Sequence, residues 1–168
     1  MTHSITTKGL YLAAAFAIAM TNFTNCSDKE AAGYIGQSDI AVEDGKMTPE
    51  VMLSLGRLSD PQLSPDGKTI LYGVSYTSVP DNRSCRNLFL VNADGTCRRQ
   101  LTREGSSISC ARWTEGGRSI MYIQKGQIRK ATVRGLGGNS PKLVKKTVIS
   151  DIPAGISEFK LSPDGSRI

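Results

Sequence analysis

The sequence of 168 residues predicts an all-β fold built from repeated four-stranded sheets. The phrase "LSPDG" occurs at residues 63–67 and again at 161–165, and a weaker copy, "WTEGG", lies between them at 113–117. The closing glycines of the three copies lie 50 and 48 residues apart. A period of about 40–50 residues is typical of propeller blades with four strands each. We therefore predict a partial β-propeller of about two blades and the start of a third, after a signal segment and a short helix.

The first 25 residues have the features of a signal segment for export. Lys8 precedes an apolar run of twelve residues, Gly9 to Met20, which is too short to span a bilayer and suits a secretory signal. Cys26 closes this segment and resembles the modified cysteine of bacterial lipoprotein signals, so it is the candidate residue for lipid attachment. Ordinary signal cleavage is the alternative, because the spacing from the apolar run fits both. We expect a protein of the periplasm or a lipoprotein of the outer membrane or cell surface.

Two elements are expected between the signal segment and the repeats. Residues 26–46 are polar and lack apolar periodicity, which predicts a flexible tether. A short helix is expected over residues 49–55, with Thr48 as its N-cap and Pro49 in its first turn. Gly56 is expected to end this helix in the left-handed conformation.

The incomplete propeller is expected over residues 47–168, with blades at about 57–103, 109–149 and 157–168. Alternation of apolar and polar residues predicts the strands of the first blade at 60–64, 69–75, 87–91 and 96–102. The same pattern predicts those of the second blade at 110–114, 118–124, 127–133 and 142–148. The Pro and Asp-Gly residues between strands favour tight turns, whereas residues 76–86 are expected to form a long loop.

Two blades and a fragment cannot close a ring, because closed propellers have about four to eight blades. The third predicted blade stops inside its second strand. We therefore expect this chain to be the N-terminal piece of a longer protein.

The distribution of charge argues against a nucleic-acid binding site. The formal net charge is +6, and the segment from Arg118 to Ser150 holds eight basic residues and no acidic one. A nucleic-acid site would need stacking aromatic side chains in this run, and only Tyr122 offers one, so we expect a solvated blade face and no nucleic-acid partner.

The mature chain is expected to hold no metal and no cofactor. Cys85, Cys97 and Cys110 have spacings that match no metal motif, and no glycine-rich phosphate loop is present. We expect these cysteines to be small buried side chains, with a disulfide between Cys85 and Cys97 as an alternative.

The chain lacks the residues of a hydrolytic triad. Its single histidine, His3, lies in the expected signal segment, and the closest approach to a GxSxG elbow, residues 138–142, lacks the second glycine. Asp66, Asp94 and Asp164 lie in turn phrases and are expected to serve turn geometry. We therefore expect no catalytic residue in this chain.

Three segments resemble the start of the propeller in the prolyl oligopeptidase family of serine peptidases: "MTPEVMLSLGRLSDPQLSPDG" at 47–67, "NLFLVNADGT" at 87–96 and "RRQLT" at 98–102. The resemblance covers about residues 47–168 and is strongest to exported dipeptidyl-peptidase and acylaminoacyl-peptidase-like members from Bacteroidota. In that family the propeller gates access to a C-terminal α/β-hydrolase domain, which supplies the nucleophile, acid and histidine.

The resemblance implies the substrate-gating propeller portion of an exported serine peptidase. Its expected partners are peptide substrates, reached through the full-length protein, the C-terminal hydrolase domain of the same protein and, through a lipid anchor, a membrane. A non-enzymatic binding propeller of the TolB type, or a lipoprotein scaffold, is the alternative, because TolB-type propellers share the repeat phrases and fold does not fix function.

Overall fold

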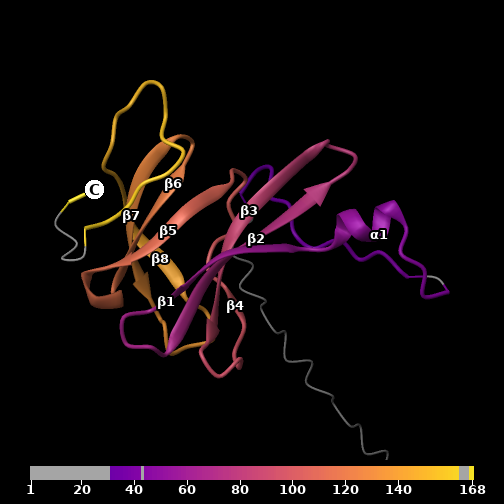
Figure 1. Ribbon diagram of the computed structural model, residues 1–168, viewed down its shortest axis with the longest axis horizontal. Helices are drawn as coiled ribbons and strands as arrows, with labels where there is room; N and C mark the ends of the chain where they lie inside the picture. The colour runs from indigo at the N-terminus through magenta and orange to yellow at the C-terminus, as the bar shows by residue number, and fades with distance from the viewer. Residues whose placement is uncertain (1–30, 43, 163–166) are drawn as a thin grey trace, which may run out of the picture.

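The computed structural model describes residues 31–42, 44–162 and 167–168, so the expected signal segment and Cys26 lie outside the described residues. Eight strands form two antiparallel sheets of four strands, each in sequence order (Figure 1). The first sheet comprises β1 (Arg57–Leu63), β2 (Thr69–Ser78), β3 (Arg83–Asn92) and β4 (Arg99–Gln100). The second comprises β5 (Ile108–Thr114), β6 (Ser119–Gln124), β7 (Gln127–Arg134) and β8 (Lys142–Val148). The prediction of an all-β fold with two four-stranded units is confirmed.

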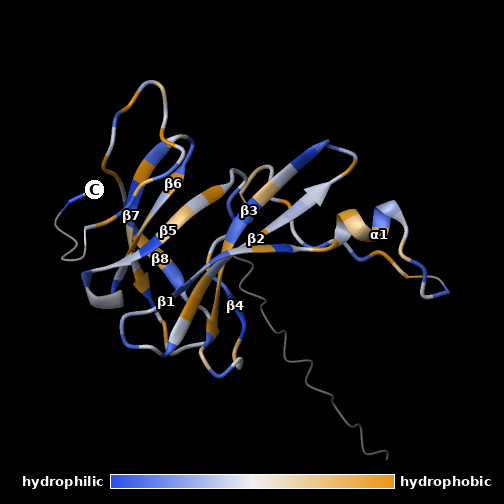
Figure 2. Ribbon diagram, viewed as in Figure 1, coloured by the Kyte–Doolittle hydropathy of each residue, from blue (hydrophilic) through white to orange (hydrophobic). Residues whose placement is uncertain are grey.

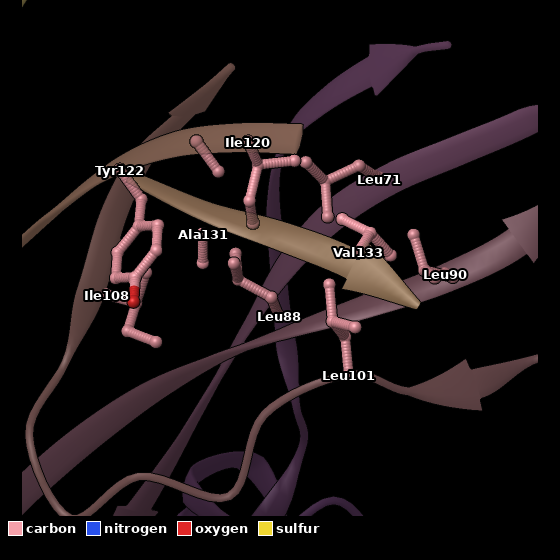
Figure 3. Close-up of a cluster of buried hydrophobic side chains, with 10 residues drawn as sticks. Leu71, Leu88, Leu90, Leu101, Ile108, Ile120, Tyr122, Ala131 and Val133 are labelled. Carbon is pink, nitrogen blue, oxygen red and sulfur yellow. The ribbon is translucent and has the colours of Figure 1, made fainter. Parts of the chain in front are cut away.

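The two sheets pack face to face through a shared apolar core (Figure 3). Figure 2 shows apolar stretches along the strands of both sheets, and successive side chains of a strand point to opposite faces, so part of this apolar surface faces the other sheet. The first sheet contributes Leu71, Leu88 and Leu90, and the second contributes Ile108, Ala111, Ile120, Tyr122, Ala131 and Val133. Each fully buried leucine or isoleucine stabilises this packing by about 1.5–3 kcal/mol. The sheets are therefore held as neighbouring blades.

The hairpin of β2 and β3 is longer than predicted. The expected long loop over residues 76–86 is wrong, because paired strands continue to Ser78 and Arg83. The sequence offers no glycine to mark the reversal, which is closed instead by Asn82 in the left-handed region at φ 44°. Tyr76 and Cys85 face each other in the added rungs and are both buried, so packing extends the pairing.

The expected third blade shows no strand within residues 149–162 and 167–168. This segment instead runs as irregular chain against the second sheet, where Phe159 is buried beside Cys110, Met121 and Ile128. Its backbone meets the sheet at Ile156, whose N–H donates to the carbonyl of Gly126 at 2.8 Å. A first strand needs a partner strand for its hydrogen bonds, and no described residues supply one here.

Helix α1 (Pro49–Ser54) is confirmed with its predicted cap, because the Thr48 hydroxyl accepts a hydrogen bond from the N–H of Val51 at 3.3 Å. The prediction for Gly56 is wrong. The helix ends in extended backbone at Leu55, and Gly56 is absent from the described residues with positive φ. A Cβ atom at Gly56 would lie 2.7 Å from the Tyr76 ring, so this glycine allows the chain to approach β2 closely.

Part of the predicted tether packs on the first sheet. Ile35 is buried in a cluster on the face of the first sheet that carries Tyr72 and Phe89. Arg83 Nη2 donates to the carbonyl of Gly33 at 2.5 Å, and the Tyr34 hydroxyl bonds with the side chain of Gln100. Residues 31–36 therefore pack on the sheet. The burial of Ile35 and these hydrogen bonds hold the segment in place although most of the residues around it are polar.

Candidate functional site

The first strands of the two sheets, β1 and β5, carry the same irregularity. Their pairing with β2 and β6 shifts register within residues 59–62 and within residues 109–112. Asp60 in β1 has φ 51° and Cys110 in β5 has φ 50°, which is the left-handed region that few residues other than glycine adopt. Each lies three residues before the first letter of its repeat phrase. A bulge of this kind re-aims the side chains that follow it.

The bulge in β1 supports an ion cluster between the sheets. The Asp60 carboxylate accepts from Nη1 of Arg112 in β5 at 2.9 Å and 2.8 Å, and from Nε2 of Gln62 at 3.1 Å. Nη2 of Arg86 in β3 lies 3.7 Å from the same carboxylate. Two guanidinium groups therefore share one carboxylate, which leaves a surplus of one positive charge.

The cluster is only partly shielded from water. The side chains of Asp60, Arg86 and Arg112 are 22%, 17% and 27% exposed. Burial is the main influence on Arg86 and lowers the pKa of its guanidinium, while Asp60 acts in the opposite direction. Nε and Nη2 of Arg86 are buried without a hydrogen-bond partner among the described residues. The guanidinium lies over Gly73, where a Cβ atom would come within 2.1 Å of Nε.

A hollow of about 430 Å³ lies beside this cluster, where the first strands reach their repeat phrases. Its lining consists of Gln62, Leu63, Pro65, Arg112, Trp113, Lys160 and Leu161. Leu63, Trp113 and Leu161 hold the same position in the three repeats, and Gln62, Arg112 and Lys160 hold the position before it. Equivalent residues of rotated repeats come together only near the rotation axis. The hollow lies between the first strands of the two sheets and the irregular chain at 160–161, and we name it the axial hollow because the first strands of a propeller's blades would meet around its central channel there.

The hollow combines apolar walls with two cations. Trp113 forms part of its wall, and Nε1 of this side chain donates to the Gln62 carbonyl at 3.3 Å, which links the two first strands. Arg112 and Lys160 are the charged residues among the lining, and no acidic residue lines it within the described part of the chain. Such a surface suits an anionic group joined to an apolar or peptide body.

Sequence reasoning did not identify these residues as a site. Asp60, Arg86, Arg112 and Lys160 are far apart in sequence and match no motif. One signal in the sequence could have pointed to the site. When the three repeat phrases are aligned, Gln62, Arg112 and Lys160 occupy the same position, immediately before each phrase.

A second hollow, of about 640 Å³, is formed mainly by turns of both sheets. Asp66 there accepts hydrogen bonds from the Ser64 hydroxyl at 2.5 Å and the Lys68 N–H at 3.1 Å. Asp94 accepts from the N–H and hydroxyl of Thr96 at 2.9 Å and 2.6 Å. These bonds hold the pKa of both carboxyl groups below its usual range. Both carboxylates stabilise their turns, as the sequence predicted, while Asp164 lies outside the described residues.

The three described cysteines are free thiols. Cys85 and Cys110 are buried, as predicted, and burial raises the pKa of the Cys85 thiol. The prediction of burial is wrong for Cys97, which is exposed in the turn before β4. Across the ranges that the structure describes, no group of three His, Cys, Asp or Glu side chains is placed to hold a metal ion.

The basic run after Arg118 is partly paired by acids from outside it. Lys130 forms an ion pair with Glu115, and Lys146 pairs with Glu104 at 2.6 Å. Both pairs are substantially exposed, as expected for a solvated blade face. Within the described residues, no helix is long and apolar enough to cross a membrane.

Two curated proteins are similar to this chain in sequence, and no profile of a known protein family matches it. A protein named dipeptidyl-peptidase 5 from Porphyromonas endodontalis is 32% identical over 128 residues, which are 75% of this chain and 18% of that protein. A dipeptidyl-peptidase 5 from Porphyromonas gingivalis is 38% identical over 98 residues, which are 55% of this chain and 14% of that protein. The chain therefore spans less than a fifth of the length of these relatives.

Proposed function

We propose that this chain, which is related in sequence to the dipeptidyl-peptidases, forms part of the substrate-gating propeller of an exported serine peptidase. The observation that carries the proposal is the meeting of three repeats at one hollow, beside the seam of two packed blades. A propeller surrounds a central channel, and residues near its axis line the path that a substrate would take.

The hydrolytic step is assigned to a C-terminal α/β-hydrolase domain of the same protein. Apart from His3, this chain contains no histidine, and a serine nucleophile of the triad type needs an imidazole as its base. We expect the purified 168-residue chain to leave chromogenic dipeptide substrates intact and to resist labelling by a fluorophosphonate probe. Covalent labelling of the purified chain would contradict this assignment.

The coding sequence that follows residue 168 distinguishes the peptidase from the alternative function. A downstream domain with a GxSxG elbow, an acid and a histidine is expected for the peptidase. A sequence that continues with further blades and then ends would instead support a non-enzymatic binding propeller of the TolB type.

Gating itself is tested at Trp113, in the protein that joins this chain to its hydrolase domain. Trp113→Ala widens the hollow and removes the bond to Gln62, so we expect it to change kcat/KM for long peptides more than for dipeptide substrates. Equal changes for both substrate lengths would contradict a gating role. Leu136→Ala is the matched control, since Leu136 packs beside the core away from this hollow.

Export and lipid attachment belong to the same proposal. The apolar run before Cys26 and the position of this cysteine support a lipoprotein held at the outer membrane or cell surface. Mass spectrometry of the mature protein is expected to find an acylated N-terminal Cys26. An unacylated terminus at another residue would remove the anchor from the proposal and leave export in place.

A further inference from the structure

The positive charge beside the axial hollow is not balanced by the residues around it. Asp60 supplies one negative charge to two guanidinium groups, those of Arg86 and Arg112. Lys160 adds another cation on the lining and forms no ion pair with an acid in the described ranges. A partly desolvated surplus of this kind attracts an anion.

Arg112 is fixed in a way that leaves hydrogen-bond donors available. Its Nη1 donates to both Asp60 oxygens and to the carbonyl of Ala111 at 2.8 Å. Among the described residues, the hydrogen bonds that Arg112 donates all come from Nη1, and the side chain lines the hollow. A guanidinium presents Nε and Nη2 as one fork, which matches the two oxygens of a carboxylate. Asp60 thus holds the group in place and leaves this edge for a ligand.

The remaining walls indicate what carries the anion. Leu63, Trp113 and Leu161 supply apolar surface, while Nε2 and the backbone carbonyl of Gln62 are already engaged by Asp60 and Trp113. A phosphate or another small inorganic anion would use none of that apolar surface. A carboxylate attached to a short peptide would use both the cations and the walls.

We propose that Arg112 and Lys160 form a carboxylate-binding site on the axial wall, and that this site takes the carboxylate of a peptide. The inference rests on the proposed function, because it names the group that a peptide substrate presents at the hollow. The carboxylate has two possible sources, the C-terminus of the peptide or an acidic side chain. Both have the same chemistry, and the choice of peptide separates them.

Trp113 makes the test direct, because it is the single tryptophan of the chain and lines the hollow. The full 168-residue chain is titrated at low ionic strength with four peptides, and tryptophan fluorescence is followed. The first pair is N-acetyl tetra-alanine with a free or an amidated C-terminus. The second is N-acetyl-Ala-Glu-Ala-Ala-amide or its Gln counterpart. We expect the peptides with a carboxylate to bind at least about tenfold more tightly than their neutral partners, as for hydrogen bonds to charged groups.

Three variants locate the effect. Arg112→Gln is expected to remove at least about tenfold of the affinity for the carboxylate peptides, and Lys160→Gln about two- to fivefold, as for an exposed ion pair. Lys125→Gln, in the turn between β6 and β7, is the matched control and should leave the affinity unchanged. Since Arg112 also holds the ion cluster, Lys160→Gln keeps the test valid if Arg112→Gln does not fold.

The outcomes separate this inference from the function on which it rests. Equal binding of acid and amide peptides, or unchanged affinity in Lys160→Gln together with Arg112→Gln, would overturn the carboxylate site and leave a peptide-gating wall intact. Absence of any fluorescence response in a folded chain would also overturn the site. The proposed function would then be decided separately by the coding sequence after residue 168.

Discussion

The bulges of β1 and β5 share one backbone geometry and differ in the side chain that they present. Both bulged residues are in the left-handed region, and both precede a repeat phrase by three residues. Asp60 reaches Arg112 of the next sheet, whereas Cys110 donates from Sγ to the carbonyl of Phe159 at 3.3 Å. In each repeat the bulge therefore directs one side chain toward the repeat that follows.

The difference between them is one of electrostatics. The contact from β1 is an ion cluster with a surplus cation, and the contact from β5 is a weak thiol hydrogen bond beside apolar residues. The shared backbone places the contact, and the side chain decides whether the site is charged. We therefore expect the variants below to affect the two bulges unequally.

The largest effect is expected for Asp60→Ala. It would leave Arg86 and Arg112 facing each other without an anion, and removing one partner of a buried ion pair costs about 3–5 kcal/mol. Because these side chains keep some exposure, we expect about 2–3 kcal/mol of lost unfolding free energy. Denaturant unfolding measures it. A loss below about 0.5 kcal/mol is in the range of ordinary surface changes. It would show that water already screens the charges of the cluster, so that the ion pairs contribute little to stability.

Gly73→Ala should have the next largest effect. Its φ is compatible with alanine, but the added Cβ would lie 2.1 Å from Nε of Arg86 and displace the guanidinium from Asp60. We expect a loss of about 1–2 kcal/mol in unfolding free energy, as for an overpacked site. Gly137→Ala is the matched control, because a Cβ there meets nothing within 4 Å. Equal stability of the two variants would contradict the close packing of Arg86 over Gly73.

Cys110→Ala tests the second bulge and should cost less. It removes one sulfur atom and a weak hydrogen bond and leaves no charge unpaired, so we expect a loss of about 1 kcal/mol or less. Thermal unfolding beside Asp60→Ala gives the comparison. If Cys110→Ala proved the more destabilising of the two, the ion cluster would not be the stronger contact between repeats.

Lys160→Gln should have the smallest effect. The side chain is exposed and has no ion pair with a described acid, so the expected change in unfolding free energy lies within about 0.5 kcal/mol. Chemical denaturation of the variant beside the unchanged chain measures it. A larger loss would assign Lys160 to folding and weaken its role in binding.

Sequence reasoning predicted the second sheet better than the first. Strands β5 to β8 follow short alternating runs separated by glycine-containing turns, so local residues determine both type and position. The β2–β3 hairpin was missed because its extension depends on tertiary burial of Tyr76 and Cys85. The attachment of residues 31–36 was missed for the same reason, since only one apolar side chain, Ile35, marks it.

The site was less accessible to sequence reasoning than the fold. The repeat phrase predicted the blade period, and its phase places Arg112 and Lys160 at equivalent positions. Arg86 has no such signal, because it reaches Asp60 only by crossing Gly73 on the neighbouring strand. The surplus positive charge comes from residues on three strands, β1, β3 and β5, that come together only in the folded chain. A local sequence pattern cannot predict such a tertiary contact.

The most direct test of the account is collisional quenching of Trp113 by iodide and by caesium at matched ionic strength. If three repeats meet at a cationic hollow, iodide is attracted to this tryptophan and caesium is repelled. We predict an iodide-to-caesium ratio of quenching constants about threefold above that of free N-acetyltryptophanamide, falling toward it in Lys160→Gln. A ratio equal to that of the free compound, in a folded chain, would contradict a cationic axial hollow at Trp113.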